Sequence, residues 1–320
     1  MNIPMQTNYY EHPLFDPSQL HFETRQTQKL AETFNRWIWT GSIGGRVLGH
    51  TRTGKTTALE VVAKKLTNRA GVVLPSHIFY VPRRDKPTIA SVYRNLCLSV
   101  NLHIGTNRAS LNADILASDF TQYIIDTTLA NGTNTFILMV DEMQRLTPNQ
   151  LYAFSEMYDL LRLSRLNLVT FFIGNKLESK RLLEVVKQKE YSHINKRFFS
   201  QRFIFDGLRT KDDVNYCLTQ YDISVFPPQS KTSYTHFFLP TEWNNGFQLS
   251  SLTDQIWTAF LRVKKQYSLN DWGMQYFVSA INTLLIDFLP NDGLGNFSIE
   301  TILACIELSG LTSSLIDIEQ

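Results

Sequence analysis

The chain has 320 residues, of which 43% are hydrophobic and 19% charged, which excludes a disordered chain and fits a soluble globular protein. No apolar run reaches the roughly 20 residues that cross a bilayer, and the N-terminus lacks a basic and apolar leader, so we expect neither a membrane span nor a secretory signal. Three widely spaced cysteines, Cys97, Cys217 and Cys305, match neither a zinc spacing nor a disulfide set. Reduced thiols and a cytoplasmic location are therefore expected.

The net charge of +2 conceals an uneven distribution along the chain. Residues 1–210 hold 26 Lys and Arg against 17 Asp and Glu, a balance of +9, whereas residues 211–320 hold 5 against 12, a balance of −7. A basic first part suggests a polyanionic partner for that part. An ordinary solvated surface would give the same counts, so both interpretations remain open.

The first elements surround a glycine-containing motif. Residues 1–23 are rich in aromatic residues and proline and are expected to form an extended N-terminal arm, and periodicity then predicts a helix over 24–40. A short apolar strand at 46–48 and a helix over 56–66 flank the motif. The complete pattern G-x-x-x-x-G-K-[ST] runs through Gly49, His50, Thr51, Arg52, Thr53, Gly54, Lys55 and Thr56.

This motif, placed between a strand and a helix, predicts a binding site for a nucleoside triphosphate. Gly49 and Gly54 allow backbone N–H groups to approach the phosphates, and the following helix adds the positive end of its dipole. Lys55 is expected to neutralise the β- and γ-phosphate oxygens, and the Thr56 hydroxyl to bind Mg²⁺. With Thr57, the whole segment 49–57 is expected to contact ATP.

Strand and helix patterns alternate up to about residue 207. Strands are expected at 77–81, 136–140, 168–173 and 203–205, and helices at 89–100, 113–129, 148–163 and 178–189. This alternation predicts a doubly wound parallel α/β core over residues 24–210. The strand pattern then stops, and residues 211–320 are expected to form an α-helical domain, with helices at 214–221, 249–267, 272–288 and 299–308.

Two adjacent carboxylates, Asp141 and Glu142, end the apolar strand 136–140. Uncompensated acids at the end of a buried strand are costly, and a metal ion with a phosphate would explain them. Asp141 is expected to hold Mg²⁺, and Glu142 to orient and polarise the attacking water. Two solvated acids at an exposed strand end would be the alternative.

Three further residues are candidates for the reaction. Asn175 ends the strand 168–173 and is expected to position water or contact the γ-phosphate, although Gly-Asn is also ordinary turn chemistry. Arg197 is expected to reach the γ-phosphate of a neighbouring subunit, and Arg202 competes for this role. Both arginines could instead be surface residues without a role in the reaction.

Four segments, in this order along the chain, resemble those of the AAA+ ATPases. They are the motif 49–56, MVDEMQRL around Asp141 and Glu142, FFIGNK around Asn175, and NKRFFSQRFIF. The resemblance is nearest to the transposition regulators TnsC and TniB, especially the TnsC proteins of CRISPR-associated transposons, and it covers about residues 20–260. It implies an AAA+ core with a helical lid and nucleotide bound between subunits. Gln248 stands where many relatives carry arginine, so slow hydrolysis, stimulated by assembly, is expected.

The resemblance also implies partners. Such proteins form ATP-dependent rings or filaments on duplex DNA and link a TniQ-type target selector, often with an RNA-guided effector, to a TnsB-type transposase. The expected DNA contacts lie on a basic turn between two prolines and on the helix after it. These residues are Arg83, Arg84, Lys86, Thr88 and Arg94. Taken alone, the turn could equally be a solvated basic loop.

Two other interpretations are carried forward. One is an AAA+ ATPase of another DNA transaction or of a secretion system. A replication initiator would be expected to carry a helix-turn-helix domain after the lid, which the acidic residues 211–320 do not favour, and a secretion ATPase would be expected to add a membrane span or a wall-binding domain. The other is a nucleotide-gated scaffold with little turnover, in which ATP only stabilises the assembly.

Overall fold

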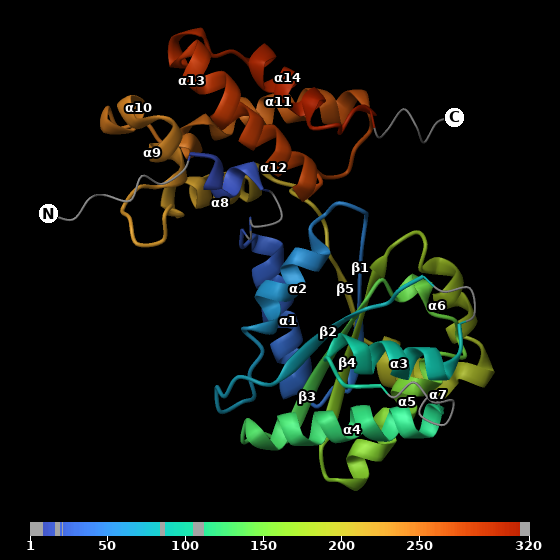
Figure 1. Ribbon diagram of the computed structural model, residues 1–320. Coiled ribbons are helices and arrows are strands. Elements are labelled where there is room, and N and C mark those ends of the chain that lie inside the picture. Colours follow the sequence, from blue (N-terminus) through green and yellow to red (C-terminus); the bar gives the residue numbers. More distant parts are fainter. Residues whose placement is uncertain (1–8, 17–19, 21, 84–86, 105–111, 314–320) are drawn as a thin grey trace, which may run out of the picture. The chain divides into compact units, whose positions relative to one another are not determined.

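The computed structural model describes residues 9–16, 20, 22–83, 87–104 and 112–313. The chain divides into two compact units (Figure 1). One unit, the core unit, contains Thr27–Thr51 and Lys55–Phe205. The other, the helical unit, contains Met1–Gln26, Arg52–Gly54 and Asp206–Gln320.

A five-stranded parallel sheet in the order β2-β3-β4-β1-β5 forms the centre of the core unit. The strands are β1 (Gly44–Gly49), β2 (Ser76–Tyr80), β3 (Thr135–Asp141), β4 (Asn167–Asn175) and β5 (Arg202–Ile204). All four predicted core strands after the motif are present within two residues of their expected bounds. Because the strands are parallel, their carboxyl ends meet at one edge of the sheet.

Helices cover both faces of this sheet (Figure 1). They are α1 (Arg25–Trp39), α2 (Lys55–Ala63), α3 (Ile89–Ser99), α4 (Ala113–Ala130), α5 (Leu151–Leu163), α6 (Lys180–Val186) and α7 (Ser192–Ile194), which continues as the π-helical turn Asn195–Phe199. Successive strand residues point to opposite faces. Phe171 therefore packs with residues of α1 and α2, and its ring stacks on that of Phe34 with 3.8 Å between the ring centroids. Phe172 packs on the opposite face, with residues of α3, α4 and α5.

The helical unit has its own hydrophobic core. Its helices are α8 (Lys211–Ile223), α9 (Tyr234–Phe238), α10 (Pro240–Asn244), α11 (Thr253–Gln266), α12 (Met274–Thr283), α13 (Leu289–Asp292) and α14 (Ile299–Leu308). The buried carboxylate of Asp222 fixes the chain between them, because it accepts hydrogen bonds from Leu249 N, Ser250 N and the Thr235 hydroxyl. Among the described residues, none of the helices is long and apolar enough to cross a bilayer.

Three expectations about this unit are corrected. Within the predicted N-terminal arm 1–23, the described residues 9–11 and 13–15 form short 3-10 turns instead of an extended segment, and Leu14 is buried in the helical unit. The helix predicted over 272–288 divides into α12 and the π-helical turn Leu284–Phe288. The helix predicted over 249–267 starts with the 3-10 turn Leu249–Leu252 before α11.

Candidate nucleotide-binding site

The register of the sheet places the ends of three strands together. Gly49 of β1 lies opposite Asn175 of β4, and β3 ends beside β4 at Asp141. A Cβ added to Gly49 would lie 2.3 Å from the carbonyl oxygen of Phe205, so only glycine fits this close approach to the chain after β5. Gly54 has φ +88°, a left-handed conformation that favours glycine. Glycine is therefore required at position 49 by a close contact and favoured at position 54 by the backbone conformation.

Lys55 begins α2 and is surrounded by backbone oxygens. Its Nζ donates to the His50 carbonyl oxygen at 2.5 Å and to that of Gly49 at 3.3 Å. Burial lowers the pKa of Lys55, while the carboxylates of Asp141 and Glu142 act in the opposite direction. A partly desolvated ammonium group that donates to two carbonyl oxygens is suited to bind an anionic phosphate.

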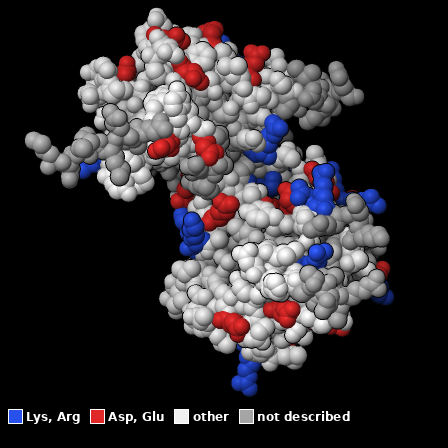
Figure 2. Space-filling model, viewed as in Figure 1, with Lys and Arg blue, Asp and Glu red and all other residues white. Residues whose placement is uncertain are grey.

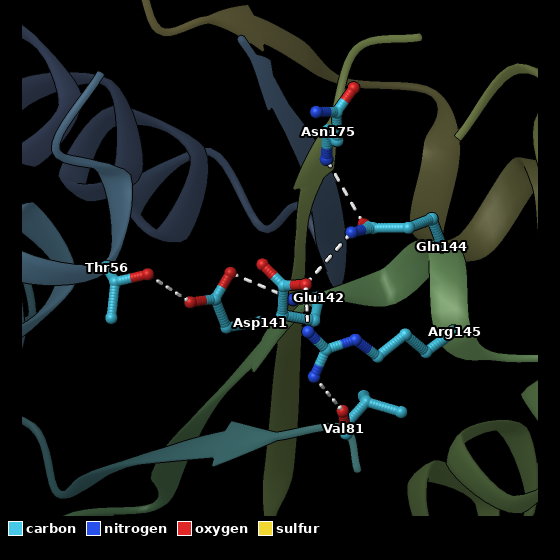
Figure 3. A network of polar contacts seen from close by, with 7 residues as sticks. All are labelled: Thr56, Val81, Asp141, Glu142, Gln144, Arg145 and Asn175. Carbon is cyan, nitrogen blue, oxygen red and sulfur yellow. Dashed lines mark hydrogen bonds and ion pairs between the residues drawn. The ribbon is translucent and has the colours of Figure 1, made fainter. Parts of the chain in front are cut away.

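Thr56 and Asp141 are brought together from distant parts of the sequence. The Thr56 hydroxyl donates to Asp141 Oδ2 at 2.7 Å (Figure 3). Asp141 is only 1% exposed, and its other oxygen accepts a hydrogen bond from Glu142 N at 2.8 Å. A hydroxyl and a carboxylate oxygen at this spacing fit Mg²⁺, which takes few protein ligands and completes its shell with phosphate oxygens and water.

Glu142 adopts a left-handed backbone conformation, with φ 63° and ψ 38°. This turns the chain out of β3 into a 3-10 turn, Met143–Arg145. Arg145 Nη2 lies 2.7 Å from Glu142 Oε2, and Gln144 Nε2 donates to the same oxygen at 3.1 Å (Figure 3). Neither Gln144 nor Arg145 belongs to the motifs that predicted the site, and in the sequence only their closeness to the two acids indicates a function.

Asn175 has a local structural use. Its Oδ1 accepts hydrogen bonds from Leu177 N at 2.8 Å and Glu178 N at 3.2 Å, so the side chain stabilises the turn after β4. Its amide nitrogen makes no hydrogen bond within the described part of the chain. Asn175 therefore lies at the carboxyl edge of the sheet, as predicted, and it also stabilises a turn, as the alternative interpretation proposed.

The two candidate arginines lie in different settings. Arg197 Nη1 donates to Ser155 Oγ at 2.8 Å and to Asp159 Oδ2 at 3.0 Å, and its guanidinium lies 5.0 Å from the Tyr158 ring centroid. Arg202 is exposed at the start of β5. In the described residues, neither arginine contacts the phosphate-binding loop of its own chain.

The predicted DNA-contacting residues are only partly described. Arg83 and Arg94 are exposed, and Thr88 forms the N-cap of α3, where its hydroxyl accepts a hydrogen bond from Ser91 N. Arg84 and Lys86 lie outside the described residues. Figure 2 shows another group of basic side chains on the part of the core unit that carries α6. The exposed cations of α6 include Lys180 and Arg181.

Comparisons with known proteins agree with this architecture. Residues 45–183 match the family model described as an AAA domain. The Aeropyrum pernix ORC2 protein, solved in ADPNP and ADP complexes, is similar over 94% of this chain and 72% of its own, with 12% identity and a TM-score of 0.58. The Aeropyrum pernix ORC1 protein in complex with DNA is similar over 92% and 68%, with 13% identity and a TM-score of 0.51. Among curated proteins, none matches the sequence significantly.

These likenesses establish the fold, and the geometry of the loop places the nucleotide motif within it. The predicted doubly wound parallel core with a helical C-terminal region is confirmed. Residues 45–183 therefore match an AAA domain, and the chain has the AAA+ P-loop fold.

Proposed function

We propose that this protein is a Mg²⁺-dependent ATPase. The observation that carries the proposal is the convergence of Lys55, Thr56 and Asp141 at the carboxyl edge of the sheet, with Thr56 and Asp141 only 2.7 Å apart. Lys55 binds the β- and γ-phosphates, and Thr56 with Asp141 holds Mg²⁺, which neutralises charge on the phosphate oxygens. Glu142 follows directly after Asp141 and takes the role of orienting and polarising water.

The remaining candidates complete this proposal. The Asn175 amide nitrogen lies on the strand next to the loop and contacts the attacking water or the γ-phosphate. Arg197 serves the site of a neighbouring subunit, as the motif resemblance implies. Ser155 and Asp159 position its side chain, and a positioned group is more effective than a freely moving one. Arg202 is the competing candidate. The functional enzyme is accordingly a homo-oligomer.

We further propose that the oligomer assembles on duplex DNA. Support comes from the charge balance of +9 over residues 1–210 and from the exposed Arg83 and Arg94. The structurally similar ORC1 protein was solved with DNA. Contacts from lysine and arginine to phosphates would give binding that is largely independent of sequence and weakens steeply with salt.

The specific task proposed is regulation of transposition, in which the DNA-bound oligomer connects a TniQ-type target selector with a TnsB-type transposase. The support is the motif resemblance in the segments around Asp141, Asn175 and Arg197. A second candidate is an ATPase of replication initiation, which the fold likeness to the ORC proteins favours. A nucleotide-gated scaffold is the third.

One set of experiments separates these functions. Electron microscopy with a non-hydrolysable ATP analogue and duplex DNA should reveal rings or filaments around DNA, and isolated monomers without DNA would refute the assembly. Binding of purified TnsB-type and TniQ-type proteins to the assembly favours transposition, whereas preference for one origin-like sequence favours initiation. If wild-type turnover is undetectable and Glu142→Gln leaves assembly unchanged, the scaffold is correct.

A further inference from the structure

Glu142 is held through one oxygen only. Arg145 and Gln144 both bind Oε2, at 2.7 and 3.1 Å, and no described residue binds Oε1. Figure 3 shows the second oxygen turned away from Arg145. The carboxylate is thus oriented by its two neighbours while one oxygen is left available for a water molecule.

Both neighbours are themselves anchored to other strands of the sheet. Arg145 Nη1 donates to the carbonyl oxygen of Val81, directly after β2, at 2.9 Å. Gln144 Oε1 accepts a hydrogen bond from Asn175 N, at the end of β4, at 3.1 Å. Glu142, directly after β3, is therefore connected to the ends of the strands on both sides, and its orientation depends on the register of the sheet (Figure 3).

Two features show that the local backbone is constrained for this arrangement. Glu142 keeps a left-handed conformation, with φ 63°, that is strained for a non-glycine residue, and such strain persists where the surroundings impose it. Gly174 provides the space for Gln144, because a Cβ there would lie 2.8 Å from Gln144 Oε1 and 2.7 Å from Ser179 Oγ. Any side chain at 174 would displace the glutamine.

We propose that Gln144 and Arg145 are positioning residues that orient Glu142 for its reaction with water. This inference rests on the proposed ATPase function. Arg145 pairs its charge with Glu142 and also donates to the Val81 carbonyl oxygen, so it holds the carboxylate relative to β2. Gln144 binds both Glu142 and the backbone of Asn175, so it holds the carboxylate relative to β4. Both residues lie outside the phosphate-binding loop 49–56, so we expect them to act on the turnover rate and not on ATP affinity.

The test compares Gln144→Ala, Arg145→Ala and Arg145→Lys with wild type, in the presence of duplex DNA. General base catalysis contributes roughly 10²- to 10⁴-fold, so a misplaced base should lower kcat by about 10- to 100-fold. KM for ATP should change less than about twofold. Arg145→Lys keeps the charge but not the two-point geometry, so it should recover part of the loss. Arg162→Ala, an exposed arginine on α5, is the matched control.

A double-mutant cycle distinguishes positioning from a general loss of structure. In a Glu142→Gln background, Gln144→Ala and Arg145→Ala should lower kcat no further, because the group they orient is absent. An increase in kcat on losing Arg145 would show that the ion pair restrains Glu142 and would overturn the inference. So would equal losses in both backgrounds, or parallel losses of ATP affinity and thermal stability.

The outcomes also separate this inference from the proposed function. Wild-type turnover that is absent, or that is unaffected by Glu142→Gln, refutes the ATPase mechanism and the inference together. Turnover that depends on Glu142 and is insensitive to Gln144 and Arg145 refutes the inference alone.

Discussion

The Thr56 hydroxyl and the Asp141 carboxylate, 85 residues apart in sequence, are joined by a hydrogen bond of 2.7 Å. The contact links the first turn of α2 to the end of β3, the two elements between which a triphosphate and its metal ion would lie. Replacing either oxygen should therefore change the proposed metal site, while α2 and β3 keep their hydrophobic packing.

Asp141→Asn tests this contact. The amide can still accept the Thr56 hydrogen bond, but it lacks the negative charge that Mg²⁺ prefers. We expect Mg²⁺-dependent ATP turnover to fall by about 100-fold or more, since metal ions supply several kcal/mol of charge stabilisation. The measurement is turnover as a function of Mg²⁺ concentration. An unchanged Mg²⁺ dependence would remove Asp141 from the metal site.

Arg197→Ala tests the contribution of a neighbouring subunit. An arginine supplied in trans is worth roughly 10³- to 10⁵-fold in phosphoryl transfer, so turnover of the assembled protein should fall by about 100-fold or more. Asp159→Asn is the matched control, because it removes the same ion pair and leaves the arginine in place. Arg202→Ala should have little effect, and the reverse result would give Arg202 the role.

Mixed subunits make the trans contribution directly visible. Arg197→Ala subunits keep an intact phosphate loop, and Lys55→Ala subunits keep the arginine. Mixing the two inactive variants should restore part of the turnover, because some interfaces then combine one intact loop with one intact arginine. No recovery in assemblies shown to contain both variants would place Arg197 outside the neighbouring site.

His12 should make the stability of the helical unit depend on pH. It is buried among Phe226, Tyr234, Phe237 and Phe238, and burial lowers its pKa to about 4. The unfolded chain binds a proton at about pH 6.5, so the folded state loses stability as pH falls from 6.5 to about 4. The loss attributable to His12 should be on the order of 3 kcal/mol.

Chemical denaturation at a series of pH values measures this effect. His12→Asn, which has no titrating ring, should flatten the dependence between pH 6.5 and 4. His103→Asn, at an exposed histidine, should leave the dependence unchanged. Identical pH profiles for wild type and His12→Asn would show that another group is responsible.

DNA binding through the predicted basic turn is tested by reversing charge at Arg83 and Arg94 together. If each contacts a phosphate, affinity should fall and the slope of log affinity against log salt should decrease by about 2. Lys180→Glu with Arg181→Glu, on α6, is the control with the same charge change. A loss confined to the α6 variant would move the DNA-binding surface to that side of the core unit.

The elements that the sequence predicted best are those with strong local signals. The run 136–140 is apolar throughout, as a strand covered on both faces must be, and the strand ends at Asp141, as predicted. Helices α3 and α14 were predicted from periodicity with bounds that agree to within one residue.

The missed features depend on contacts between distant residues. No local pattern indicates that Glu142 takes a left-handed conformation, so the convergence of Gln144 and Arg145 on its carboxylate could not be predicted. The packing of Leu14 in the helical unit joins opposite ends of the sequence, which periodicity does not detect. Short helices such as α9 contain too few residues to show a period.

The central claim is that Lys55 binds the triphosphate, and titration of a non-hydrolysable ATP analogue with Mg²⁺ into Lys55→Ala tests it most directly. Lys64→Ala, at an exposed lysine just after α2, is the control. We predict an affinity at least about 100-fold below wild type for Lys55→Ala, since losing a charged contact to phosphate costs roughly 3 kcal/mol, and no change for Lys64→Ala. Wild-type affinity in a folded Lys55→Ala variant would contradict the account.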